Sequence, residues 1–137
     1  MTRTPSQTVG PFYSIGLCRR PDDELEPDGL ELTGTLSDGL GKPIVDGVIE
    51  VFDAASKTWG RSGTEAAGRF RFLVPRAATR LEAYVFARGL LRHQLTRIYL
   101  DGGSGAEDPT LVAVRDGAGM RFDIRMQGED ATVFFVP

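Results

Sequence analysis

The sequence is poor in the side chains that most often hold metals or cross-link secreted proteins. Its 137 residues include one cysteine, Cys18, and one histidine, His93. A single cysteine cannot form an internal disulfide and is typical of a reducing compartment, so we expect a cytoplasmic protein. His93 alone cannot assemble a mononuclear iron site, which generally needs several imidazole or phenolate ligands. We expect this histidine to lie on the surface or in a loop.

Long apolar runs and an excess of positive charge are also missing. No stretch of 18 apolar residues occurs, so we expect no membrane-spanning helix, and the opening Met-Thr-Arg-Thr-Pro lacks the apolar segment of a signal peptide. The chain has 19 acidic and 16 basic residues, a net charge of −3, which predicts no nucleic-acid-binding surface. Apolar residues make up 41% of the chain, as in an ordinary globular domain.

Prolines interrupt the first part of the chain. Pro5, Pro11, Pro21 and Pro27 each fix one backbone angle and remove one amide donor, which excludes a long helix. Between them runs a charged stretch without periodicity, residues 19–28, which is typical of a solvated linker. The sequence therefore predicts an extended N-terminal arm and linker over residues 1–29.

Alternating polar and apolar residues follow from position 30 onward, and they predict strands buried on one face. The clearest case is Met120, Phe122, Ile124 and Met126, which alternate with polar neighbours. No helical period is present, and glycine- and proline-bearing turns separate the short strands. We expect an all-β fold, an antiparallel β-sandwich of about eight strands over residues 30–137. The expected strands cover residues 30–36, 48–53, 69–74, 81–88, 94–100, 111–115, 120–126 and 132–136.

Three motifs resemble those of one enzyme family. The first is Thr-Pro-Ser-Gln-Thr-Val-Gly-Pro-Phe-Tyr at residues 4–13, the second is Val-Phe-Ala-Arg-Gly at 85–89 with Leu-Thr-Arg-Ile-Tyr at 95–99, and the third begins at Arg121 and ends at Phe135. Together they cover about a third of the chain, in the family's order. On these motifs the chain resembles the intradiol ring-cleaving dioxygenases. This resemblance implies the same β-sandwich.

The catalytic chains of that family bind ferric iron through two tyrosines and a His-x-His pair, and the matching positions here lack them. Residues 57–60 read Lys-Thr-Trp-Gly where the first tyrosine is expected, and residues 75–79 hold no second tyrosine. Arg80 and Glu82 stand where the histidine pair would align. The resemblance therefore implies an α-type subunit without a metal site of its own. The Fe(III) would be held by a homologous iron-bearing β subunit in a hetero-oligomer, which cleaves an aromatic dihydroxy acid such as protocatechuate.

The resemblance also implies that such a subunit lines its partner's substrate pocket. This role carries over to Thr8, Gly10, Pro11 and Phe12 of the first motif and to Arg88 of the second. Thr8 offers a hydroxyl, Gly10 permits a close approach of backbone and ligand, and Pro11 stiffens that segment. Arg88 presents a fork of donors that matches a carboxylate. We expect the isolated chain to be inactive.

Other interpretations stay open at this point. Residues 8–12 can serve only as a strap over a sheet, Arg88 can pair with a nearby acid such as Glu82, and Trp59 can be an interface or core anchor. The whole chain can also be a stand-alone, metal-free sandwich that acts as a binding or interaction module. Finally, Phe122, Ile124 and Met126, followed by residues 133–135, offer much apolar surface. We expect this surface to form a large interface with a homologous sandwich.

Overall fold

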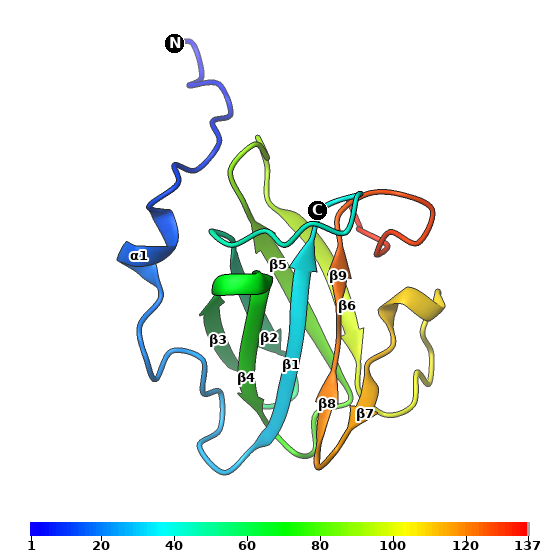
Figure 1. The fold of residues 1–137 in the computed structure, drawn as a ribbon. Coiled ribbons are helices and arrows are strands. Elements are labelled where there is room, and N and C mark those ends of the chain that lie inside the picture. The colour runs from blue at the N-terminus through cyan, green and yellow to red at the C-terminus, as the bar shows by residue number, and fades with distance from the viewer. Residues whose placement is uncertain (137) are drawn as a thin grey trace.

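Two β-sheets packed face to face form the body of the protein, and a computed structural model describes residues 1–136 of it (Figure 1). One sheet has the strand order β4-β1-β8-β7, with β9 also paired to β1, and the other has the order β3-β2-β5-β6. Most neighbouring strands are antiparallel, and β1 runs parallel to β8 and β9. The prediction of an all-β sandwich is confirmed. The strands are β1 Leu30–Ser37, β2 Val48–Asp53, β3 Thr58–Gly63, β4 Arg69–Val74, β5 Arg80–Phe86, β6 Gln94–Tyr99, β7 Val114–Asp116, β8 Gly119–Arg121 and β9 Ile124–Arg125.

The core lies between the sheets and is made by the alternation that the sequence shows. In β1 every second residue faces inward, and Leu32 and Leu36 are fully buried. β4 contributes Phe70 and Phe72, and β5 contributes alternate buried residues from Leu81 onward. Burial of such side chains stabilises the fold by about 1.5–3 kcal/mol each.

Some predicted strand boundaries are wrong. β3 was not expected, and the segment 132–136, expected as a strand, forms only an isolated bridge between Leu95 and Phe135. The expected strand over 111–115 is instead a short 3-10 helix, Pro109–Leu111, followed by β7. The expected strand over 120–126 is split into β8 and β9. At the break, the Asp123 carboxylate accepts a hydrogen bond from the backbone amide of Thr35 at 3.0 Å, in place of a backbone carbonyl.

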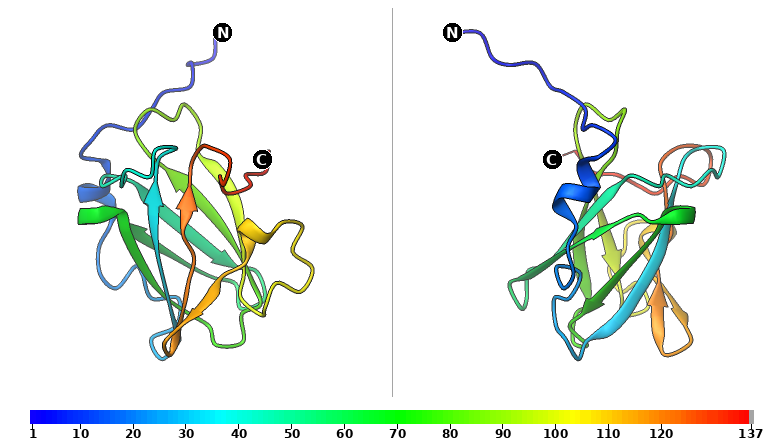
Figure 2. Two further views of the ribbon diagram at one scale, coloured as in Figure 1. Left: turned by 45° about the vertical axis from the view of Figure 1, so that its right-hand side comes forward. Right: turned by 60° about the vertical axis from the view of Figure 1, so that its left-hand side comes forward.

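The N-terminal segment projects from the sandwich at its first residues and then runs alongside it (Figure 2). It includes α1, Tyr13–Leu17, a single short turn that buries none of its residues. Further along, the chain joins the body at the open edge between the sheets. The Arg61 amide of β3 donates to the Asp22 carbonyl, the Leu73 amide of β4 donates to the Asp23 carbonyl, and Leu25 enters the core. Among residues 1–136, no helix has the length and apolar character needed to cross a membrane.

Candidate functional site

The arm meets the β5–β6 connection through Thr8. Its hydroxyl oxygen accepts a hydrogen bond of 2.6 Å from the backbone amide of Gly89. Gly89 adopts a positive φ of 89°, a conformation that suits glycine and aims this amide at the arm. The structure thus brings Thr8 of the first motif next to the Arg88–Gly89 pair of the second, although 81 positions separate them in the chain.

Arg88 makes an ion pair with Asp46. Its Nε lies 2.8 Å from Asp46 Oδ2, and the arginine side chain is 62% exposed. Arg88 thus pairs with an acid, as one of the open interpretations had it, but the acid is Asp46 and not Glu82. Glu82 instead accepts a long hydrogen bond from Tyr84, with 3.4 Å between the Tyr84 hydroxyl and Glu82 Oε2. Because most of Arg88 faces solvent, its guanidinium can still donate to an anion supplied from outside this chain.

Gly10, Pro11 and Phe12 lie exposed between that contact and α1. A Cβ placed on Gly10 would meet no atom within 4 Å, so nothing in the described part of the chain requires a glycine there. The Gly10 carbonyl accepts from the Tyr13 amide at 3.2 Å, which closes a tight turn over these residues. The Phe12 ring is 75% exposed. A large exposed ring is available to a second molecule.

Behind the arm, four rings form a cluster that the sequence did not reveal. Tyr13 lies 6.2 Å from Phe86 between ring centroids, and His93 lies 5.3 Å from Phe86 and 5.6 Å from Tyr84. A cavity of about 350 Å³ opens between three of these rings, Tyr13, Phe86 and His93, and the arm residues Gln7 and Val9. Burial, and then the charge of Glu82, raise the pKa of Tyr84.

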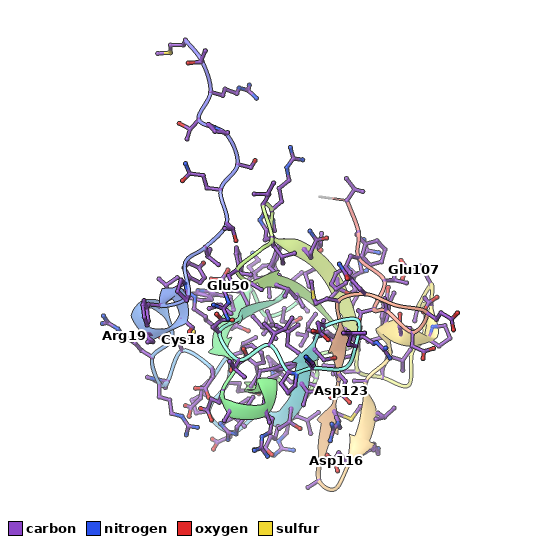
Figure 3. The ribbon with its side chains drawn as sticks, turned by 45° about the horizontal axis from the view of Figure 1, so that its top comes forward. Cys18, Arg19, Glu50, Glu107, Asp116 and Asp123 are labelled. Atoms are coloured by element: carbon purple, nitrogen blue, oxygen red, sulfur yellow. The ribbon has the colours of Figure 1, made fainter. Side chains whose placement is uncertain are left out.

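The donor set does not fit a ferric site. Among residues 1–136, no three His, Cys, Asp or Glu side chains come together closely enough to hold a metal ion. Figure 3 shows how dispersed such groups are, with Cys18 beside α1, Glu107 on the opposite side of the molecule and Asp116 on the β7–β8 hairpin. At the positions where the sequence comparison expected ligands, the structure has Trp59, Arg80 and Glu82 on β3 and β5. An arginine and a tryptophan offer no ligand to iron.

The expected apolar interface is misplaced. Phe122 and Ile124 are 2% and 0% exposed, because they pack inside this chain's own sandwich. Aromatic side chains are found instead on the outer face of the four-stranded sheet, where Trp59 of β3 pairs in register with Phe52 of β2. Trp59 is 53% exposed, and the Arg61 guanidinium lies 5.2 Å from its ring centroid. We call this surface the outer aromatic face; its members are Phe52, Trp59, Tyr84, Phe86 and Phe135.

Comparison with known proteins supports the family resemblance of the three sequence motifs. No protein-family model matches the chain. It is 30% identical to the protocatechuate 3,4-dioxygenase alpha chain of Burkholderia cepacia, over 98% of both chains, and 32% identical to that of Pseudomonas putida, over 98% of this chain and 96% of the relative. Of the solved structures, hydroxyquinol 1,2-dioxygenase from Pseudomonas putida DLL-E4 superposes with a TM-score of 0.60 at 15% identity, covering 94% of this chain and 68% of the enzyme. At that identity the superposition supports the fold alone.

Proposed function

This chain belongs to the family of protocatechuate 3,4-dioxygenase alpha chains, and from that premise we propose that it acts as the α subunit of such an enzyme. It would pair with a homologous β subunit to cleave protocatechuate with O2 to 3-carboxy-cis,cis-muconate. The observation that carries this proposal is the similarity to two alpha chains along nearly the whole sequence. The alternative of a stand-alone binding module has no comparable support. The lone Cys18 favours the cytoplasm as the location.

The Fe(III) of the assembly is assigned to the β subunit. Ferric iron, when bound there, activates a catechol ring toward oxygen. The role of this chain is to bind and orient the substrate, since no three His, Cys, Asp or Glu side chains of residues 1–136 come together to hold a metal ion. We expect the isolated chain to be inactive for this reason.

Five residues of this chain are assigned to the partner's substrate pocket: Thr8, Gly10, Pro11, Phe12 and Arg88. All five are exposed in the isolated chain, on the side where the arm leaves the body. The Thr8 oxygen accepts from Gly89, and its hydroxyl makes only a long contact of 3.5 Å to the Val9 carbonyl, which a ligand can replace. Arg88 supplies a positive charge for the carboxylate of protocatechuate.

The partner is proposed to pack on the outer aromatic face. Rings on an exposed sheet face are typical of protein interfaces, because they bury a large area at a small entropic cost. Phe52, Tyr84 and Phe86 alternate with core residues along β2 and β5, so they point away from the chain's own core. The arm with Thr8 and Phe12 begins beside the same face, where Tyr13 packs on Phe86. One partner could therefore contact both.

Co-expression tests the proposal. We expect ring cleavage of protocatechuate when this chain is produced together with a homologous chain that carries two tyrosines and a His-x-His pair. The chain produced alone should contain no stoichiometric iron and show no turnover. About one iron per isolated chain, with the visible absorption of tyrosinate-bound Fe(III), would contradict the assignment of the metal to the partner. Failure of the two chains to co-purify would contradict the subunit role.

A further inference from the structure

A cleft lies at the edge between the sheets. Its volume is about 740 Å³, within the usual range of small-molecule sites. The segment around Cys18–Arg20 forms one wall, the end of β3 with residues 64–67 forms another, and the outer faces of β4 and β1 form the floor. None of the five residues assigned to the substrate pocket lines it.

Strand pairing places basic side chains in a row across this floor. Thr33 of β1 pairs with Arg71 of β4 on one side and with Arg121 of β8 on the other. Neighbouring strands lie about 4.8 Å apart, so the two arginines flank Thr33 from adjacent strands. In the next pair along β1, Thr35 stands opposite Arg69. Three guanidinium groups thus border one polar strip of two threonines.

The cleft is rich in positive charge although the chain as a whole is acidic. Six arginines line it, against two acidic residues, Asp23 and Glu65. Three of the arginines have acidic partners, in the ion pairs Arg61–Glu50, Arg71–Glu31 and Arg121–Asp123. Within residues 1–136, Arg19, Arg20 and Arg69 form no ion pair. Figure 3 shows Arg19 beside α1, at the margin of the molecule.

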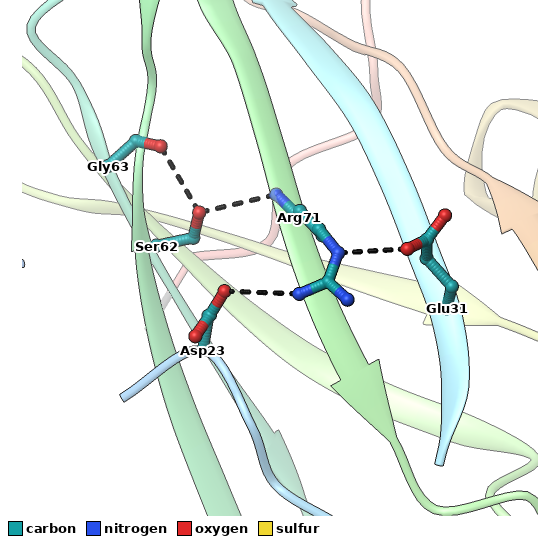
Figure 4. A network of polar contacts seen from close by, with 5 residues as sticks. All are labelled: Asp23, Glu31, Ser62, Gly63 and Arg71. Carbon is teal, nitrogen blue, oxygen red and sulfur yellow. Dashed lines mark hydrogen bonds and ion pairs between the residues drawn. The ribbon is translucent and has the colours of Figure 1, made fainter. Parts of the chain in front are cut away.

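Arg71 is held ready in this cleft (Figure 4). Its Nε donates to Glu31 at 2.8 Å, its Nη1 lies 3.5 Å from Asp23, and its backbone amide donates to the Ser62 hydroxyl. These contacts fix the guanidinium plane, while Nη2 has no hydrogen-bond partner among the described residues. The contact with Glu31 costs an incoming anion little, because Glu31 is 52% exposed and exposed ion pairs contribute only about 0–1 kcal/mol.

We propose that this cleft binds a small polyanion, a molecule with two or more carboxylate or phosphate groups, over Thr33 and Thr35. Arg69, Arg71 and Arg121 would donate to its oxygens in the paired geometry that guanidinium groups favour. The Thr33 hydroxyl is a further donor, whereas the Thr35 hydroxyl already donates to Asp123 at 2.9 Å. A single carboxylate would reach too few of these arginines to bind well. The inference does not depend on the proposed ring-cleaving function.

Titration calorimetry on the full chain at low ionic strength tests it, with citrate, inorganic phosphate and acetate as separate probes. Citrate and phosphate represent the carboxylate and phosphate sources. We expect at least one of them to bind at one site per chain, with acetate much weaker. Binding should weaken as salt is added, because salt screens exposed charges. In an amide NMR spectrum, the signals of Thr33 and Thr35 should move during the same titration.

Paired variants give the control. The double variant Arg69→Gln/Arg121→Gln should lose about tenfold or more in affinity. The matched variant Arg80→Gln/Arg115→Gln removes the same charge from two exposed arginines outside the cleft and should bind as the parent does. An equal loss in both variants, or no binding of citrate or phosphate, would overturn the proposal. Binding of an acidic peptide in place of both small anions would also overturn it.

Discussion

Arg88 carries a charge that is 62% exposed and is held by one ion pair, with Asp46. In the assembled enzyme we expect Arg88→Ala to raise the KM for protocatechuate by about tenfold, which is the effect of losing one charged hydrogen bond. The kcat should change less, because the contact is made in both the ground state and the transition state. Catechol has no carboxylate, so its KM should stay nearly constant. Steady-state kinetics with both substrates checks this, and equal losses would assign Arg88 to the fold or the interface.

Asp123 offers a test of charge at a single residue. Burial alone would raise the pKa of its carboxyl, but hydrogen bonds from Arg121 and Thr35 outweigh burial and lower this pKa. A lowered pKa in the folded state adds stability above the unfolded value of about 3.9, and this stability is lost as the pH falls through the folded value. We expect Asp123→Asn to cost about 0.5–1 kcal/mol at pH 7, since the side chain is half exposed, and much less at pH 3.

Urea unfolding at the two pH values measures this difference. Asp101→Asn is the control, because Asp101 is exposed and makes no ion pair among the described residues. A cost for Asp123→Asn that is the same at both pH values would show that the charge is not what matters. The Asp123–Thr35 contact would then act only through its shape and its hydrogen bond to the strand.

The ion-pair partner of Arg88 could not be predicted from the sequence. The sequence predicts that an exposed arginine pairs with an acid, and Arg88 does, but the acid that the sequence suggested was Glu82, on the strand just before it. Asp46 is chosen because β2 and β5 are antiparallel with Val48 opposite Phe86, which brings the residues just beyond those two together. The register between two strands depends on the tertiary structure, so it cannot be predicted from the periodicity of one strand.

At the scale of elements, β3 was missed because its sequence, Thr-Trp-Gly-Arg-Ser-Gly, has no apolar alternation and holds two glycines. The structure explains both glycines. A Cβ on Gly60 would collide with the Leu25 side chain, and one on Gly63 would crowd the Cys18 sulfur. The N-terminal segment packs where these side chains would be. Alternation predicted the strands that face only the core, and it failed where another segment covers the strand.

Gly34 in the middle of β1 gives a prediction for this scale. A Cβ there would collide with the backbone carbonyl of Phe122 and with the ring of Phe70, and neither the backbone nor the buried ring can move freely. We expect Gly34→Ala to destabilise the fold by about 3 kcal/mol or more, as overpacking of a core does. Gly16→Ala in α1 meets nothing within 4 Å and should leave the unfolding midpoint unchanged. A Gly34→Ala variant as stable as the parent would mean that β1 and β8 can separate.

For the whole molecule, the sandwich and the family could be predicted from the sequence, but the place of the interface could not. An alternating apolar pattern shows that one face of a strand is buried. It does not show whether that face packs on the chain's own second sheet or on another subunit. Phe122 and Ile124 pack on the chain's own sheet. Phe52 and Trp59 lie outward because β2 already contributes Ile49 and Val51 to the core from its other face. Which residues face the core and which face outward is decided by the arrangement of the two sheets.

The outer aromatic face then predicts how the assembly can be broken without damage to the fold. Trp59→Asp places a charge on the β3 edge of the surface proposed for the β subunit, where the side chain is 53% exposed and contributes nothing to the core. Because an aromatic anchor of an interface contributes about 2 kcal/mol or more, we expect the variant to bind the β chain at least about 30-fold more weakly. Its thermal unfolding should match that of the parent. Val114→Asp is the matched control, because Val114 is equally apolar and 60% exposed but lies on β7 of the other sheet. Sedimentation of the co-expressed chains measures the assembly, and a Trp59→Asp variant that assembles as the parent does would place the partner on another face.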